Sequence, residues 1–186
     1  GYDIALCAAN LGASVILVSG PSHCKVNHSN IQVISVVSAQ EMYKVCHDYY
    51  SQVDVAIAAA AVADYRPKIV ASQKIKKSED EFVIELEKTK DILASLGMSK
   101  QNQFLIGFAL ETENEIENAK LKIQKKNLDL IVLNSLQDQG AGFGKETNKV
   151  TFIDKNFKIE PMDLKSKKAV ANDILTKVIS HFSCIT

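Results

Sequence analysis

Charged side chains follow an alanine-rich segment near the middle of the chain. The apolar run at residues 53–61 is a predicted strand, and its end is made of small side chains, those of Ala58, Ala59 and Ala60. A carboxylate, a guanidinium and an ammonium group come next, in Asp64, Arg66 and Lys74. Ligands of open α/β sheets bind beyond the carboxyl ends of strands, where small side chains leave room for them. The segment therefore predicts a site for a charged nucleotide.

A second set of ammonium groups lies on a predicted helix at residues 113–126. Lys122 and Lys126 are four residues apart, so they share one face of the helix and can reach one polyanion. Lys120 and Lys125 lie on the same helix, and solvated lysines are common on helices. An ordinary charged helix face is the alternative interpretation of this pair.

Strand and helix patterns alternate along the chain and would position these groups. Strands are predicted at residues 13–19, 31–37, 53–61, 103–109 and 128–133, the last three apolar enough to be buried on both faces. Helices are predicted at residues 1–11, 38–50, 91–96, 113–126 and 163–182, and a β-hairpin at 149–160. Ser38 and Glu41 have the spacing of a capping box. The pattern predicts an α/β fold, a Rossmann-like three-layer sandwich with a mostly parallel sheet, a C-terminal β-hairpin addition and a final helix.

Composition limits the classes of protein that fit. The 186 residues are expected to form one domain, and 22 basic residues balance 22 acidic ones, which argues against nucleic acid or a membrane as a partner. Four cysteines lie far apart with no C-x-x-C pair, and no apolar run reaches about 20 residues. A cytoplasmic location is expected. His23, Cys24 and His28 lie in a loop-like segment, and no metal ligand is assigned.

Three motifs in this order resemble one enzyme family. They are AAAVADYRP at residues 59–67 with KIKK at residues 74–77, IGFALET at residues 106–112, and AKLKIQKKNLDLIVLN at residues 119–134. A glycine-rich turn and an NKV strand at residues 140–152 extend the likeness. The chain is similar to phosphopantothenoylcysteine synthetase (phosphopantothenate–cysteine ligase), the ligase half of the bacterial bifunctional coenzyme A biosynthesis protein.

The resemblance implies an activity and partners. The family joins 4'-phosphopantothenate to L-cysteine through an acyl-cytidylate, using CTP and Mg²⁺ and releasing CMP and pyrophosphate. The ADYRP loop implies preference for CTP over ATP. A homodimer is expected, with the hairpin at residues 148–160 as one edge for the partner, and a fused or associated flavin-dependent phosphopantothenoylcysteine decarboxylase domain is a further expected partner.

The resemblance also implies roles for single residues. Lys74 corresponds to a catalytic lysine on a flexible flap, and Lys122 and Lys126 to lysines that contact the nucleotide. The other residues expected to bind CTP are Ala58, Ala59, Ala60, Asp64, Lys90, Asp91, Ile92, Leu93 and Phe108. Of these, Asp64 could bind ribose hydroxyls or Mg²⁺, and Phe108 could line the base pocket.

The chain departs from the family at two places. Thr89 and Lys90 stand where Asn-Pro is usual before Asp91 and Ile92. The family's catalytic asparagine precedes its first helix, and only the final glycine of that loop is present, as Gly1. The N-terminal strand and the asparagine and glycine-rich loop are thus expected to be missing from residues 1–186.

Simpler alternatives stay open for these residues. Lys74 could belong to a solvated turn with Lys76 and Lys77, Asp64 could pair with Arg66 or Lys68, and Phe108 could be a core side chain. For the whole chain, the alternatives are an NAD(P)-dependent Rossmann reductase and a non-catalytic nucleotide-binding module.

Overall fold

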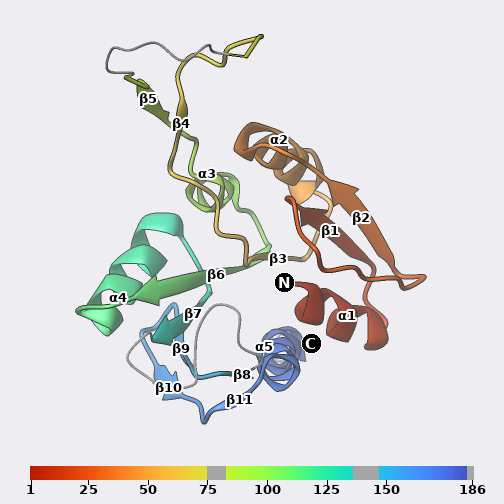
Figure 1. Cartoon of the computed structure of the whole chain (residues 1–186). Coiled ribbons are helices and arrows are strands. Elements are labelled where there is room, and N and C mark those ends of the chain that lie inside the picture. Colours follow the sequence, from red (N-terminus) through yellow and green to blue (C-terminus); the bar gives the residue numbers. More distant parts are fainter. Residues whose placement is uncertain (75–82, 136–146, 184–186) are drawn as a thin grey trace.

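The molecule has three layers, with a sheet between two groups of helices (Figure 1). The computed structural model describes residues 1–74, 83–135 and 147–183. The central sheet has the strand order β10-β9-β7-β6-β3. Its strands are β3 (Val55–Ala58), β6 (Phe104–Glu111), β7 (Leu130–Ser135), β9 (Val150–Asp154) and β10 (Ile159–Pro161). Because β3, β6 and β7 are parallel, their carboxyl ends share one edge.

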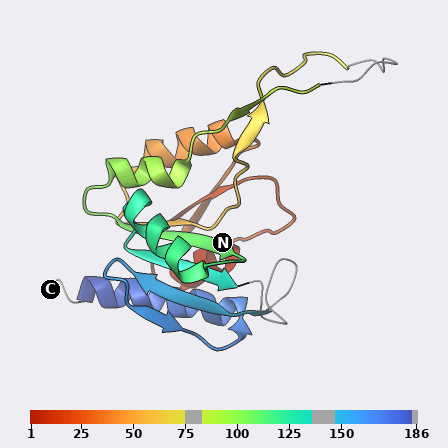
Figure 2. The ribbon, with the colours of Figure 1, turned by 90° about the vertical axis from the view of Figure 1, so that its left-hand side faces the viewer.

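The other strands form three two-stranded units. β1 (Val15–Ser19) pairs in parallel with β2 (Ile31–Ser35), and β8 (Thr147–Asn148) pairs with β11 (Lys165–Ser166). The third pair, β4 (Tyr65–Pro67) with β5 (Leu86–Lys88), is antiparallel. Figure 2 shows that this pair projects away from the layered body. We call the described residues of this segment, 65–74 and 83–88, the arm.

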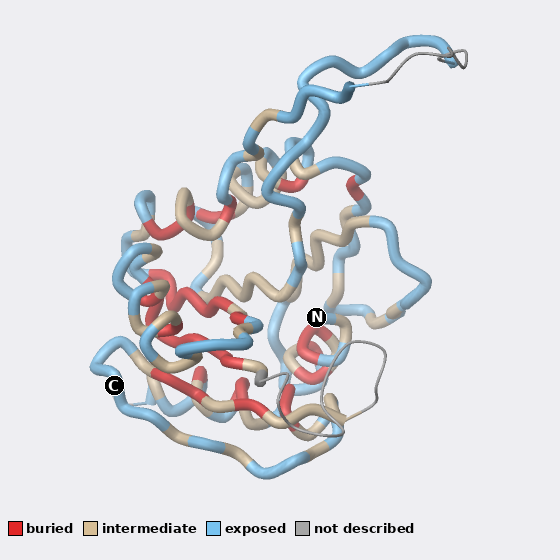
Figure 3. The backbone as a smooth tube through the Cα atoms, turned by 60° about the vertical axis from the view of Figure 1, so that its left-hand side comes forward, coloured by how far each residue is buried: buried red, intermediate tan, exposed pale blue. Residues whose placement is uncertain are grey.

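Side-chain alternation along β6 divides the core into two clusters. Phe104 and Ile106 face α1 (Tyr2–Asn10) and α5 (Lys167–Ser183). Leu105 and Ala109 face the opposite layer, which consists of α2 (Ala39–Tyr50), α3 (Ile92–Ser99) and α4 (Glu115–Lys126). Since strand side chains alternate between faces, a continuous apolar run such as FLIGFAL must be covered on both sides. The buried segments accordingly concentrate in the middle of the molecule (Figure 3).

Local sequence signals set several element boundaries. The Ser38 hydroxyl accepts a hydrogen bond from the Glu41 N–H at 3.1 Å, and the Glu41 carboxylate accepts from the Ser38 N–H at 3.3 Å. This confirms the predicted capping box at the start of α2. In the β9–β10 hairpin, Asp154 Oδ1 accepts hydrogen bonds from the N–H groups of Asn156 and Lys158, both at 2.9 Å.

The Rossmann-like fold with a mostly parallel sheet, an added hairpin and a final helix is confirmed. One predicted strand differs. The run at residues 53–61 yields only β3, from Val55 to Ala58, and its residues are half-buried rather than buried. In the described part of the chain β3 is paired along one edge only, with β6, so it has less cover than β6 and β7. Among the described residues, no helix is long and apolar enough to cross a membrane.

Candidate functional site

The carboxyl edge of the parallel strands brings polar groups from separate segments together. β3, β6 and β7 end there at Ala58, Glu111 and Ser135. Asn134, near the end of β7, accepts a hydrogen bond at its Oδ1 from Asn148 Nδ2 at 2.8 Å. α4 follows β6 directly, so it contributes side chains to the same edge. This is where a Rossmann-like sheet binds its ligand.

Lys122 of α4 reaches this edge. Its ammonium group donates a hydrogen bond to Glu111 Oε1, at the end of β6. The Glu111 side chain is 14% exposed and that of Lys122 is 41% exposed. The Lys122 side chain therefore remains partly open to solvent, while that of Glu111 is largely enclosed.

Lys126 extends from the same helix face to the start of α3. Its Nζ lies 2.8 Å from Asp91 Oδ2. Asp91 also caps α3, because its Oδ1 accepts a hydrogen bond from the Ala94 N–H at 3.0 Å. Partial burial disfavours the charged carboxylate, but the bonds from Lys126 and Ala94 outweigh it, and the pKa of Asp91 lies below its usual value.

The position of Lys126 depends on a close contact between α3 and α4. A Cβ added to Gly97 would lie 1.9 Å from the Lys126 carbonyl oxygen, so only glycine permits this approach. Asn127 ends α4 in the left-handed region, with φ 50°, and its Nδ2 donates to the Gly97 carbonyl at 3.1 Å. The backbone contact thus fixes where the lysine side chain begins.

The other residues predicted to bind the nucleotide near α3 contact neighbouring side chains of the protein. Lys90 Nζ lies 4.7 Å from the centre of the Tyr43 ring, a cation–π contact with α2. Ile92 is buried in the core cluster, and Leu93 packs near Gly107, where an added Cβ would lie 2.8 Å from its side chain. Within residues 90–93, Asp91 is thus the residue that pairs with a predicted site lysine, Lys126.

The alanine-rich segment lies at the predicted edge. Ala58 ends β3 and is half-buried, like Ala59, whereas Ala60 is exposed. Gly1, which precedes α1, approaches Ala59, since an added Cβ would lie 3.9 Å from the Ala59 Cβ. Phe108 is half-buried and packs against the cluster on the α1 and α5 side, as expected for a core side chain.

The arm and the residue just before it hold the other predicted residues. Asp64 is exposed just before β4, and Thr89 N–H donates to its carbonyl at 2.9 Å. Arg66 pairs with Glu87 at 2.7 Å and Lys68 with Glu85 at 3.2 Å, so neither takes Asp64 as its partner here. Lys74 is exposed and lies in the arm, which projects from the body (Figure 2). The structure does not bring Lys74 to the α4 lysines, and Lys76 and Lys77 lie outside the described residues.

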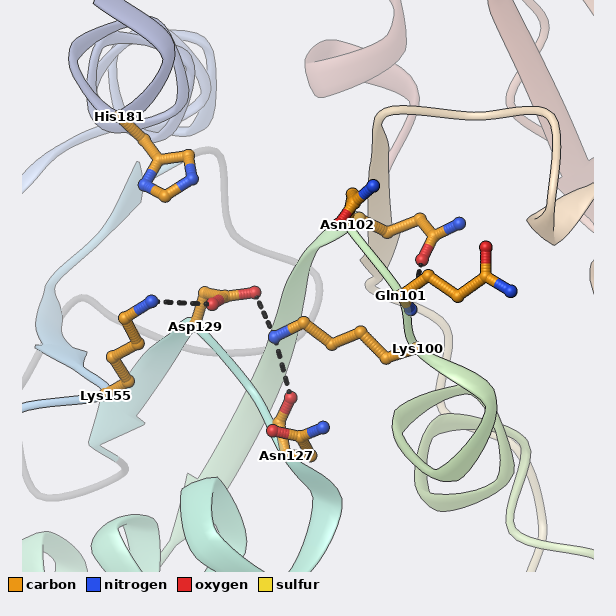
Figure 4. A pocket seen from close by; sticks show the side chains of 8 residues that line it. Lys100, Gln101, Asn102, Asn127, Asp129, Lys155 and His181 are labelled. Carbon is orange, nitrogen blue, oxygen red and sulfur yellow. Dashed lines mark hydrogen bonds and ion pairs between the residues drawn. The ribbon is translucent and has the colours of Figure 1, made fainter. Parts of the chain in front are cut away.

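A polar pocket of about 320 Å³ lies at the other end of the sheet, where β6 and β7 begin (Figure 4). At its base, the carboxylate of buried Asp129 accepts from Lys100 Nζ at 2.5 Å and from the Leu105 N–H at 2.8 Å. Lys155 Nζ is 3.5 Å from the same carboxylate. Because these charges are paired with one another, we interpret the group as a structural network, separate from the candidate site.

Sequence reasoning missed two residues of the site. Glu111 binds Lys122, and Asn118 Nδ2 donates to the other Glu111 oxygen at 3.3 Å. Glu111 stands inside the IGFALET motif, yet its partners are 7 and 11 residues away on the next helix. The sequence signal for Glu111 was a carboxylate at the end of an otherwise apolar strand, because a partly buried charge there needs a hydrogen-bonding or charged partner.

Comparison with known proteins places the chain in a family. The family model described as "DNA/pantothenate metabolism flavoprotein C-terminal domain" matches residues 1–182. The chain belongs to this flavoprotein C-terminal domain family. A crystal structure of the C-terminal domain of coenzyme A biosynthesis bifunctional protein CoaBC is 43% identical and superposes with a TM-score of 0.81, covering 98% of this chain and 83% of that one.

Two curated relatives of this domain are much longer than the chain. A cysteine/cysteine sulfinic acid decarboxylase from an unknown prokaryotic organism is 50% identical over 181 residues, which are 97% of this chain and 50% of the relative. The bifunctional protein CoaBC of Bacillus subtilis (strain 168) is 41% identical over 178 residues, 96% of this chain and 44% of the relative. The chain therefore spans about half the length of these relatives.

These findings correct the activity expected from the sequence motifs. The family description names a flavoprotein, and the relative with 50% identity is named a decarboxylase. The predicted phosphopantothenate–cysteine ligase, with its substrates 4'-phosphopantothenate and L-cysteine, is contradicted. The motifs describe side chains at the sheet edge, and such side chains do not by themselves specify a reaction. The reductase and the non-catalytic module gain no better support.

The expected cofactors are corrected too, because a flavoprotein family points to a flavin and not to CTP and Mg²⁺. A flavin ring system needs a largely apolar cavity. Two cavities among the described residues, of about 320 and 240 Å³, are lined almost wholly by polar residues, with Val53 as the apolar exception. Neither of these two cavities fits a flavin. The described residues also hold no group of three or more His, Cys, Asp or Glu residues placed for a metal.

Proposed function

We propose that this chain is the anion-binding domain of a longer enzyme of coenzyme A biosynthesis, and that the whole enzyme decarboxylates a cysteine-derived substrate. The domain contributes a site for the phosphate-type group of a ligand. The reaction is assigned to the whole protein, since the relatives that carry activity names are about twice as long as this chain.

One observation carries the binding part of the proposal. Lys122 and Lys126 lie on one face of α4, and their ammonium groups reach Glu111 at the end of β6 and Asp91 at the start of α3. Glu111 ends β6, at the edge of the sheet where Rossmann-like domains bind ligands, and Asp91 lies at the start of the helix that precedes β6. Each ammonium has three N–H donors, so pairing with one carboxylate leaves donors for a phosphate.

The name of the 50% identical relative supports the reaction class. Loss of CO₂ from an amino acid derivative breaks the bond between the α-carbon and the carboxylate and leaves an electron pair on carbon. Cofactors supply the electron acceptor for such steps, while the protein supplies binding and orientation. Since neither polar cavity fits a flavin, we propose that a separate part of the longer enzyme binds the flavin. This part corresponds to the decarboxylase domain expected as a partner.

Replacing each α4 lysine tests the binding site. We expect Lys122→Ala and Lys126→Ala each to raise the dissociation constant for inorganic pyrophosphate about tenfold, because each removes a charge-assisted hydrogen bond worth about 1.4 kcal/mol. Isothermal titration calorimetry measures this directly. Lys125→Ala is the matched control on the same helix, since its exposed side chain lies off the shared face, and it should leave affinity within about twofold. Equal affinity for all four proteins would contradict the site.

Three expectations from the sequence remain proposals here. We propose that residues 1–186 act as a single domain, that the enzyme is cytoplasmic, and that it forms a homodimer. Besides the hairpin edge, the arm offers a surface for a second copy, because Ile69, Val70 and Val83 are each about four-fifths exposed. Apolar side chains in that number on a projecting element are typical of an interaction surface.

A further inference from the structure

The Glu111 carboxylate is held more firmly than an ordinary surface acid. Oε1 accepts from Lys122 Nζ and Oε2 from Asn118 Nδ2 at 3.3 Å, and these two partners lie one turn apart on α4. Asn118 is fixed in turn, because its Nδ2 also donates to the Glu113 carbonyl at 3.0 Å. Both carboxylate oxygens are therefore engaged, and the group is largely enclosed.

The nearby Lys120–Glu117 pair shows the contrast. Its Nζ–Oε1 distance is 2.8 Å, but Glu117 is 71% exposed and both residues belong to α4. Such a pair orders little beyond the helix surface and adds little stability. Glu111 instead belongs to the central sheet, so its bond ties the free end of a helix side chain to the rigid strand edge.

We propose that Glu111 is a positioning residue for the ligand site. It fixes the Lys122 ammonium at the carboxyl end of β6. The remaining N–H donors are then already oriented toward the site before a phosphate-type anion binds. A lysine side chain loses several rotatable bonds when it is immobilised on binding, at a cost in affinity. Because Glu111 already immobilises the Lys122 side chain in the folded protein, binding of the anion does not have to do so. This inference rests on the proposed anion site.

The opposite role is that Glu111 merely competes with the ligand for Lys122. Two substitutions separate the roles. Glu111→Asp keeps the charge but shortens the side chain by one methylene, so one carboxylate can no longer hold Lys122 and Asn118 together. Glu111→Gln keeps the length and an acceptor oxygen but removes the charge. If Glu111 positions Lys122, the length of its side chain matters most. If Glu111 competes with the anion for Lys122, its negative charge matters most.

Titration of pyrophosphate into the protein gives the test. We expect Glu111→Asp to weaken binding about threefold to tenfold, the range for one side chain that must be immobilised on binding. Glu111→Gln should bind more tightly than Glu111→Asp and no more tightly than the native protein. Glu113→Asp makes the same change at an exposed neighbouring glutamate and should have no effect. Tighter binding by Glu111→Gln with unchanged Glu111→Asp would establish competition and overturn the proposal.

A double-mutant cycle shows whether Glu111 acts through Lys122. In a Lys122→Ala background, Glu111→Asp should have no further effect on pyrophosphate affinity. An equal loss in both backgrounds would overturn the positioning role, because Glu111 would then act by another route. If Lys122→Ala itself leaves affinity unchanged, the anion site fails. If Lys122→Ala weakens binding while Glu111→Asp does not, the positioning role alone fails.

Discussion

Asp129→Ala is expected to lower the free energy of unfolding by about 3 kcal/mol or more. Asp129 is 6% exposed, and its carboxylate binds Lys100 Nζ at 2.5 Å and the Leu105 N–H at 2.8 Å. Its loss leaves the ammonium group of Lys100, whose side chain is 12% exposed, without its counter-charge, and leaves a buried N–H without its acceptor. Urea denaturation followed by circular dichroism measures the change.

The Lys44–Asp48 pair is a matched control for this prediction. It joins the same two groups at 2.6 Å, but its side chains are 75% and 50% exposed. Asp48→Ala should therefore change the free energy of unfolding by no more than about 0.5 kcal/mol. Similar values for the two variants would mean that Asp129 is not part of a buried network.

Gly97→Ala is expected to lower the free energy of unfolding by about 2 kcal/mol and to weaken pyrophosphate binding. Alanine would otherwise favour the helix by up to about 1 kcal/mol. The added Cβ would lie 1.9 Å from the Lys126 carbonyl oxygen and 2.7 Å from the carbonyl carbon, and backbone cannot yield as a side-chain tip can. α3 and α4 must move apart, and the Lys126 ammonium moves away from Asp91.

Met98→Ala is the matched control, because it introduces alanine at the next residue of α3. Met98 is 82% exposed, so its replacement should alter stability by less than about 0.5 kcal/mol and leave anion affinity unchanged. A Gly97→Ala protein more stable than the native one would show that helix propensity outweighs the contact, and that α3 and α4 are less closely packed than described.

Much of the fold could be predicted because local patterns and tertiary packing agree. The continuous apolar runs of β6 and β7 imply cover on both faces, and Ser38 with Glu41 marks the start of α2 by local chemistry alone. The arm was not predicted as paired strands. β4 and β5 have three residues each, and the residues between them carry no turn signal that sets their register.

The site was only partly predictable for a related reason. The spacing of Lys122 and Lys126 predicts a shared helix face, and in the structure each lysine pairs with an acid outside α4. Which acids they meet is a tertiary matter, since Glu111 lies on β6 and Asp91 at the start of α3. Gly97 gave no sign in the sequence that it touches the Lys126 backbone.

The reaction was the least predictable feature. Ammonium groups at a sheet edge indicate an anionic ligand, but many reactions use phosphorylated substrates. The motifs led to a CTP-dependent ligase, whereas the family description and the relative at 50% identity point to a flavoprotein and a decarboxylase. The activity names belong to relatives about twice as long as this chain.

The most direct test is product analysis on the proposed longer enzyme, supplied with a flavin. The substrates would be L-cysteine, cysteine sulfinic acid and a phosphorylated N-acyl cysteine. The account predicts release of CO₂ from the substrate, and a higher KM for the phosphorylated compound when Lys122 and Lys126 are both replaced by alanine. Absence of CO₂, with pyrophosphate released from CTP when phosphopantothenate and cysteine are supplied, would contradict it.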